Sequence, residues 1–155
     1  MRSDAVVTVS EDGSAAGLPF AGVRVLIVDD HPANRELARL FLAGAGAEIS
    51  EAQDGEAGVM AATEGPFDAI LMDVRMPRLD GPGALRRIRA HPGPNDLTPI
   101  LAYTADATPE EAARLRALGF DGVVAKPVEP ATLISEVARV TTYETLSEDQ
   151  VANVG

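Results

Sequence analysis

Five short apolar runs alternate with segments of helical character along this chain, and this alternation constrains the fold more than any other feature. Residues 24–28 end at Asp29-Asp30, and residues 68–72 end at Asp73. The remaining runs cover 48–52, 98–103 and 122–125. Strands that alternate with helices pair in parallel, because each helix returns the chain along the sheet. We therefore predict an α/β fold, with a five-stranded parallel sheet covered on both faces by five helices.

The helix signals agree with this alternation. His31-Pro32 opens the first helix, since Pro is tolerated in a first turn, and Leu37, Leu40 and Phe41 form one apolar stripe at helical spacing. The later helices are predicted over 56–63, after Asp80-Gly81, from Thr108 to Gly119 and from Pro130, with a capping-box pattern at Thr108.

Length and composition set the domain organisation. The chain has 155 residues, which suits one domain with terminal tails. We predict a tail or linker over 1–20, one domain over 21–141 and an acidic tail over 142–155. No apolar run reaches the roughly 20 residues that cross a bilayer, and the N-terminus lacks the pattern of a secretory signal, so a cytoplasmic location is the default.

Charge and residue types exclude several kinds of site. A formal net charge of -11 argues against nonspecific binding to nucleic acid, which needs a basic surface. The absence of cysteine excludes disulfides and thiolate metal sites. Twelve of the thirteen basic residues are Arg, and the only lysine is Lys126. A single Lys directly before Pro127 indicates a site that needs a compact ammonium rather than a planar guanidinium.

Polar residues follow four of the predicted strands at their carboxyl ends. In open α/β sheets the binding crevice lies at that edge, where the strand order reverses. We therefore expect one pocket to contain Asp29, Asp30, Asp73, Thr104 and Lys126.

Three carboxylates in one pocket repel one another unless a cation lies between them. Ligands that are all oxygen favour Mg²⁺ or Mn²⁺, and Mg²⁺ typically takes one or two carboxylates, keeps waters and shares phosphate oxygens. Lys126 adds a second positive charge, and Thr104 adds a hydroxyl donor. This set would surround a phosphoryl group on a carboxylate, and we interpret Asp73 as the reactive residue.

An ordered set of motifs resembles the receiver domain of two-component response regulators. It consists of Val28-Asp29-Asp30, Met72-Asp73 with Met76-Pro77 and Asp80-Gly81, Thr104-Ala105, and Lys126-Pro127, and the resemblance covers about residues 22–140. It implies a flavodoxin-like sheet of order 2-1-3-4-5. It also implies that Asp73 accepts a phosphoryl group from the phosphohistidine of a histidine kinase or a histidine phosphotransfer protein.

The same resemblance implies the roles of the pocket residues. Asp30 and Asp73 would bind Mg²⁺ through their carboxylates, Arg75 through its backbone carbonyl, and Asp29 largely through water. Thr104, Ala105 and Lys126 would contact the phosphoryl group, and the Lys126–Pro127 peptide is expected to be cis.

Some positions depart from the family pattern. An aromatic residue that couples to the hydroxyl residue is usual three positions before the lysine, and this chain has Val123 there. Tyr103 is an aromatic neighbour of Thr104, but strand alternation directs it to the other face. Arg75 and Asp106 border the predicted pocket, and we hypothesise that they tune how long the phosphoryl group lasts.

Several alternatives stay open at this point. A pseudo-receiver, an interaction module that is never phosphorylated, is the main one. A Mg²⁺-dependent phosphatase similar to the haloacid dehalogenase family would carry a second Asp where this chain has Arg75, so a signalling domain is favoured over a turnover enzyme. His31 is expected to be a solvated first-turn residue rather than a metal ligand, and His91 a surface residue.

No DNA-binding or ATP-binding motif is found, so output is expected through contacts with a downstream protein, with no direct binding to DNA or membrane. A homodimer through the last two helices stays open. A stand-alone receiver and a receiver from a hybrid histidine kinase fit the sequence equally well.

Overall fold

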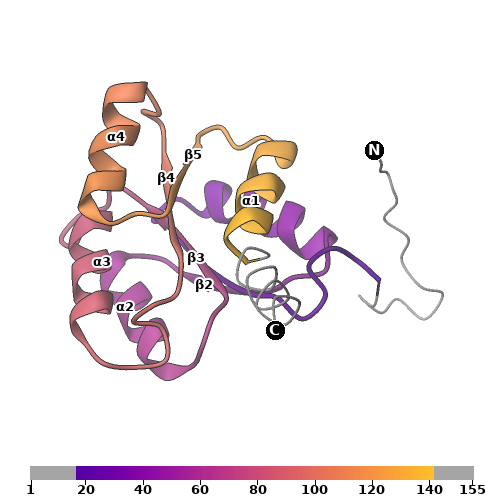
Figure 1. Ribbon diagram of the computed structural model, residues 1–155, viewed down its shortest axis with the longest axis horizontal. Coiled ribbons are helices and arrows are strands. Elements are labelled where there is room, and N and C mark those ends of the chain that lie inside the picture. Colours follow the sequence, from indigo (N-terminus) through magenta and orange to yellow (C-terminus); the bar gives the residue numbers. More distant parts are fainter. Residues whose placement is uncertain (1–16, 142–155) are drawn as a thin grey trace, which may run out of the picture.

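Five parallel strands form one sheet in the computed structural model, which describes residues 17–141 (Figure 1). The strand order is β2-β1-β3-β4-β5, which confirms the predicted topology. The strands are β1 (Arg24–Val28), β2 (Glu48–Ala52), β3 (Ala69–Asp73), β4 (Ile100–Thr104) and β5 (Gly122–Ala125).

The helices lie between the strands, as the sequence pattern predicts. They are α1 (Pro32–Gly44), α2 (Gly55–Glu64), α3 (Gly81–Ala90) and α4 (Pro109–Leu118), and a further helix spans residues 130–141. Asp54, Asp80 and Thr108 cap α2, α3 and α4 by accepting hydrogen bonds from backbone N–H groups of the first turn. These caps satisfy donors that a helix cannot pair internally.

Two layers of helices cover the sheet. Figure 1 shows α2, α3 and α4 on one side and α1 with the 130–141 helix on the other. Alternate residues of each strand point to alternate faces, so the strands supply both apolar clusters. Leu26, Ile70 and Ile100 pack toward α2, α3 and α4, whereas Ile27, Leu71 and Leu101 pack toward α1 and the last helix. Every residue of β3 and β4 is buried, which is typical of central strands in a parallel sheet.

The buried face of α1 differs from the predicted stripe. Ala38 and Leu42 are fully buried and Phe41 partly so, whereas Leu37 is 36% exposed and Leu40 is 54% exposed. The prediction of one stripe through Leu37 and Leu40 is therefore wrong. Small and large apolar residues fit the helical period equally well, and packing against the sheet selected the face that carries Ala38.

The N-terminal boundary also differs from the prediction. Leu18 and Phe20 were assigned to the tail over 1–20, but both are buried, and Phe20 belongs to the cluster beneath α1. The Phe20 backbone N–H donates to Ala45 O at 2.8 Å. The packed unit therefore begins before residue 21. Residues 1–16 and the predicted acidic tail over 142–155 lie outside the described residues.

Within residues 17–141, none of the helices has both the length and the apolar character needed to span a bilayer.

Candidate functional site

The carboxyl ends of β1 and β3 bring the three predicted acids together. These strands are neighbours in the sheet, so Asp29 and Asp30 after β1 lie beside Asp73 at the end of β3. One ligand atom from each acid, together with one from His31, falls within 4.8 Å of the others. Asp29 and Asp73 are buried and Asp30 is half-buried. The predicted acidic cluster is therefore present at the predicted edge of the sheet.

Lys126 lies between two of these acids. Its Nζ is 2.9 Å from Asp29 Oδ2 and 2.9 Å from Asp73 Oδ1. Burial works to lower the pKa of the Lys126 ammonium, but hydrogen bonds to Asp29 and Asp73 outweigh it and leave the pKa raised. The group therefore stays charged at neutral pH. The Lys126–Pro127 peptide is cis, as predicted.

Thr104 and its neighbours form another wall of the same pocket. Thr104 is buried, and its Oγ1 accepts a hydrogen bond from Asp106 N at 3.0 Å. The pocket has a volume of about 330 Å³. Its lining consists of His31, Asp73, Arg75, Thr104, Ala105, Asp106 and Lys126. Every pocket residue predicted from the sequence is therefore in this lining or in the adjoining acidic cluster.

Gly81 contributes to the site by having no side chain. A Cβ on Gly81 would lie 2.5 Å from Asp73 O, which is closer than non-bonded atoms approach. Its backbone N–H donates to Val74 O at 2.9 Å. Gly81 therefore allows the start of α3 to pack directly against the end of β3 that carries Asp73. The Asp80-Gly81 motif marked this turn in the sequence but not this contact.

The aromatic residue next to Thr104 contacts the lysine. The ring centroid of Tyr103 is 4.8 Å from Lys126 Nζ, and Tyr103 is 1% exposed. Burial, with the negative charges of Asp29 and Asp73, raises the pKa of the Tyr103 phenol to about 12. The phenol is therefore neutral at physiological pH. Sequence reasoning placed Tyr103 on the other face from Thr104 correctly but missed its contact with Lys126.

Burial makes Asp73 chemically distinct from an ordinary aspartate. It raises the pKa of the Asp73 carboxyl from 3.8 to about 6, with a further increase from the charge of Asp29 and an opposing decrease from the Lys126 hydrogen bond. Without a bound cation, the ionised carboxylate therefore destabilises the folded state at neutral pH.

We predict that Asp73→Asn stabilises the metal-free protein at neutral pH by roughly 1–3 kcal/mol. The folded pKa of Asp73 lies above its unfolded value, so the penalty is absent below about pH 4, grows between pH 4 and 6 and is complete above pH 6. Denaturant unfolding in EDTA at pH 4, 5, 6 and 7.5 would measure the difference. A stabilisation of equal size at every pH would contradict this origin.

The acidic cluster also meets the requirements of a divalent cation. Asp73 Oδ2 is buried and accepts no hydrogen bond from the described residues. Among residues 17–141, Lys126 is the Lys or Arg side chain that pairs with the buried carboxylates of Asp29 and Asp73, so the cluster keeps an excess of negative charge. Hard oxygen ligands with uncompensated charge suit Mg²⁺. The side chains present therefore fit the predicted Mg²⁺.

His31 lies at the rim of the cluster. Its Nδ1 is 3.1 Å from Asp30 Oδ1, and the side chain is 69% exposed. The exposure agrees with the prediction of a solvated first-turn residue.

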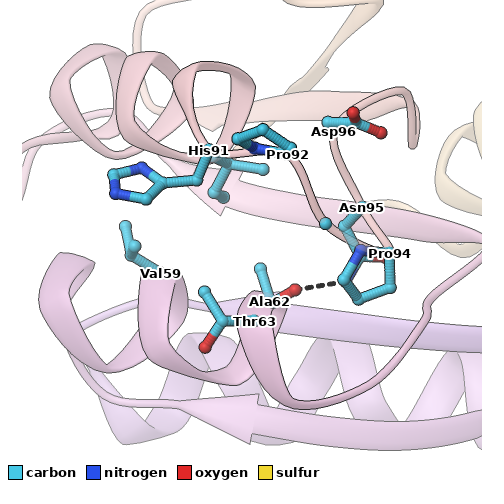
Figure 2. A pocket seen from close by; sticks show the side chains of 10 residues that line it. Val59, Ala62, Thr63, His91, Pro92, Pro94, Asn95 and Asp96 are labelled. Atoms are coloured by element: carbon cyan, nitrogen blue, oxygen red, sulfur yellow. Dashed lines mark hydrogen bonds between the residues drawn. The ribbon is translucent and has the colours of Figure 1, made fainter.

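A second cavity, of about 80 Å³, lies between α2, α3 and the loop before β4 (Figure 2). The buried polar side chain there is Asn95, whose Nδ2 donates to Ala62 O at 2.6 Å and Gly65 O at 2.7 Å, and whose Oδ1 accepts from Phe67 N at 2.7 Å. His91 is exposed, as predicted. Because backbone groups satisfy the Asn95 amide, we interpret Asn95 as a structural contact between α2 and the loop before β4.

Comparison with known proteins agrees with this geometry. The family model for the response regulator receiver domain matches residues 25–138. The sensor protein GacS of Pseudomonas syringae pv. syringae is 39% identical over 120 residues, covering 76% of this chain but 13% of GacS. The two-component response regulator ORR41 of Oryza sativa subsp. japonica is 38% identical over 115 residues, covering 72% of this chain and 88% of ORR41.

A solved structure shows the same fold. The receiver domain of the sensor histidine kinase PA1611 from Pseudomonas aeruginosa PAO1 has a TM-score of 0.72 and 34% identity, with 79% of this chain and 99% of that chain covered. That crystal structure has a magnesium ion coordinated in its active-site cleft. The family match, these relatives and the acid, hydroxyl and lysine set at one sheet edge agree, and the chain belongs to the receiver domain family of two-component response regulators.

Proposed function

We propose that this receiver domain accepts a phosphoryl group from a partner's phosphohistidine onto Asp73, with Mg²⁺ as cofactor. The observation that carries the proposal is the environment of Asp73. Its carboxylate is buried at the mouth of the sheet, one oxygen contacts Lys126 at 2.9 Å, and the other has no hydrogen-bond donor among the described residues. A carboxylate with one oxygen held and one free is arranged as a nucleophile.

The transfer needs one bond to form and one to break. A carboxylate oxygen of Asp73 forms a bond to phosphorus as the bond between phosphorus and the imidazole nitrogen breaks, and the electron pair of that bond returns to the imidazole. Lys126 Nζ, Thr104 Oγ1 and the backbone of Ala105 would contact the phosphoryl oxygens. Positioning and charge neutralisation carry most of such a reaction.

The metal would be held by Asp30, Asp73 and the backbone carbonyl of Arg75, with Asp29 acting largely through water. When bound, Mg²⁺ supplies positive charge that offsets repulsion between the Asp73 carboxylate and the incoming phosphoryl group. Lys126 would supply the second positive charge.

Donor and output are proposed from the relatives. The matched proteins include a sensor protein and a response regulator, so the donor is a histidine kinase or a histidine phosphotransfer protein. The phosphorylated domain signals in the cytoplasm by contact with a downstream protein, without direct binding to DNA or membrane. The helices α4 and 130–141 are the proposed surface for a homodimer.

Two residues at the pocket mouth are proposed to tune the lifetime of the phosphoryl group. Arg75 and Asp106 are exposed and line the pocket that contains Asp73. Both border the approach of hydrolytic water. An unchanged dephosphorylation rate in Arg75→Ala would remove Arg75 from this role.

The first test is the intact mass of the chain after incubation with acetyl phosphate and Mg²⁺, beside a sample with EDTA. We expect one phosphoryl adduct that requires Mg²⁺. If no adduct forms, binding of beryllofluoride, which mimics a phosphoryl group on a carboxylate, decides between two explanations. Binding would indicate strict dependence on a cognate donor, and no binding would indicate an interaction module that is not phosphorylated.

A further inference from the structure

Tyr103 occupies a central position beneath the phosphoryl pocket. In the sheet it is the register partner of Asp73 on β3 and of Val124 on β5. Lys126 directly follows the end of β5, two positions after Val124, and its ammonium faces Asp73 and the Tyr103 ring. The Lys126 side chain therefore passes over the Tyr103 ring on its way to Asp73.

The contacts of Lys126 divide into two kinds. Its ammonium lies 2.9 Å from Asp29 Oδ2 and 2.9 Å from Asp73 Oδ1. The Tyr103 ring centroid is 4.8 Å from the same nitrogen, within the range of about 6 Å for a cation–π interaction. The Lys126 side chain is 14% exposed, so this interaction operates with little water to screen it.

The two kinds of contact respond differently when a phosphoryl group binds. When Asp73 carries a phosphoryl group, one of its oxygens is part of an acyl phosphate, and Lys126 has to turn toward the phosphoryl oxygens. A hydrogen bond to Asp73 depends on direction and is disturbed by this change. The ring face attracts the ammonium through its charge and not through one particular N–H bond, so the ring can continue to hold the ammonium while its hydrogen-bond partner changes.

Filling space in the core explains only part of the role of Tyr103. Tyr103 belongs to the apolar cluster beneath α1, where an aliphatic side chain would also fill space. An aliphatic side chain would offer no attraction to a cation. The position three before the lysine is Val123, which packs against the opposite cluster, so Tyr103 supplies the ring beside Lys126.

We propose that Tyr103 is a positioning residue for phosphoryl recognition: its ring face holds the Lys126 ammonium at the pocket, so that it can bind phosphoryl oxygens on Asp73. This inference rests on the proposed phosphoacceptor function. It concerns the ring rather than the hydroxyl group, so Tyr103→Phe should retain the effect and Tyr103→Leu should lose it.

The affinity test uses beryllofluoride with Mg²⁺ as the probe and the full chain as the protein. We expect Tyr103→Phe to bind within about twofold of wild type and Tyr103→Leu to bind about tenfold more weakly, as expected for a desolvated cation–π contact. The affinity for Mg²⁺ alone should change less than about twofold in both, because the proposed ligands are carboxylates and a backbone carbonyl rather than the Lys126 ammonium.

A spectroscopic readout follows from the composition. Lys126 is the only lysine, so labelling with ¹³C,¹⁵N-lysine gives one set of side-chain NMR signals. The ring should shift the Lys126 Hε resonance upfield in wild type and Tyr103→Phe, and the shift should disappear in Tyr103→Leu. Leu101→Ala is the matched control, since Leu101 is buried on the same face of β4 and its truncation should leave both readouts unchanged.

The two measurements distinguish the role of Tyr103 from the phosphoacceptor function on which it rests. If wild type binds beryllofluoride and Tyr103→Leu binds equally well, with its Lys126 Hε resonance still at the wild-type position, the role of Tyr103 is overturned while the proposed function stands. If wild type neither binds beryllofluoride nor forms an adduct, both are overturned. Tyr103→Met provides a second aliphatic variant should Tyr103→Leu fold poorly, with the same expected loss.

Discussion

Replacing Asp73 with Asn is expected to abolish the phosphoryl adduct that the wild-type chain forms with acetyl phosphate and Mg²⁺. An amide is a poor nucleophile and a poor ligand for a hard cation, so one substitution removes the acceptor and weakens the metal site together. Intact mass after incubation with acetyl phosphate measures the effect. Because the same substitution is predicted to stabilise the metal-free protein at neutral pH, loss of the adduct would not reflect unfolding.

A matched control for this substitution lies at the other end of the sheet. Asp96 precedes β4 and lines the second cavity rather than the acidic pocket (Figure 2). Asp96→Asn makes the same chemical change and should leave the adduct at its wild-type level. An adduct that persisted in Asp73→Asn would place the acceptor elsewhere and contradict the assignment of Asp73.

Lys126→Met is expected to have the second-largest effect, on both stability and reactivity. Without Mg²⁺, it removes the cation between the buried carboxylates of Asp29 and Asp73. Breaking a buried ion pair on one side costs about 3 kcal/mol, because the remaining charges are left unpaired. The loss should be smaller at pH 5 than at pH 7.5, since the pKa of Asp73 is raised to about 6 and a protonated carboxyl needs no partner.

The reactivity of this variant should fall further than its stability. Removing a charged group that contacts a transferring oxygen lowers a rate by about 100-fold or more. The rate of adduct formation with acetyl phosphate measures this, at saturating Mg²⁺ so that the fold is supported. Lys126→Arg should recover stability better than rate, because a planar guanidinium does not reproduce the geometry of a compact ammonium.

Arg78→Met is the control for loss of a cation. Arg78 pairs with Asp54 at 3.2 Å, but its side chain is 65% exposed, and exposed pairs contribute at most about 1 kcal/mol. A rate in Lys126→Met equal to that of Arg78→Met would rule out contact of the ammonium with the phosphoryl group.

Local sequence was sufficient to predict the strands and the helix starts. The predicted runs at 24–28, 48–52 and 122–125 coincide with β1, β2 and β5. Caps at Asp80 and Thr108 formed where their motifs predicted helix starts. These features depend on neighbours within four residues of one another, and such short-range preferences act before any tertiary contact forms.

Long-range packing decided the features that the sequence did not predict correctly. The α1 stripe was assigned to Leu37 and Leu40, but contacts with the sheet buried Ala38 and Leu42 instead. Phe20 was assigned to a tail, yet it fills space beneath α1. In both cases apolar residues were available on more than one face or segment, and the shape of the core selected among them.

The sequence by itself determined that three acids, a hydroxyl and a lysine follow the strands. Parallel strands place their carboxyl ends at one edge of the sheet, so these groups were predicted to meet there. Only the tertiary structure decided how these groups contact one another. The 2.9 Å contacts of Lys126 with Asp29 and Asp73, and its position over the Tyr103 ring, join residues at the carboxyl ends of four strands. Their geometry depends on strand register and side-chain direction, which are fixed by pairing between segments far apart in the chain.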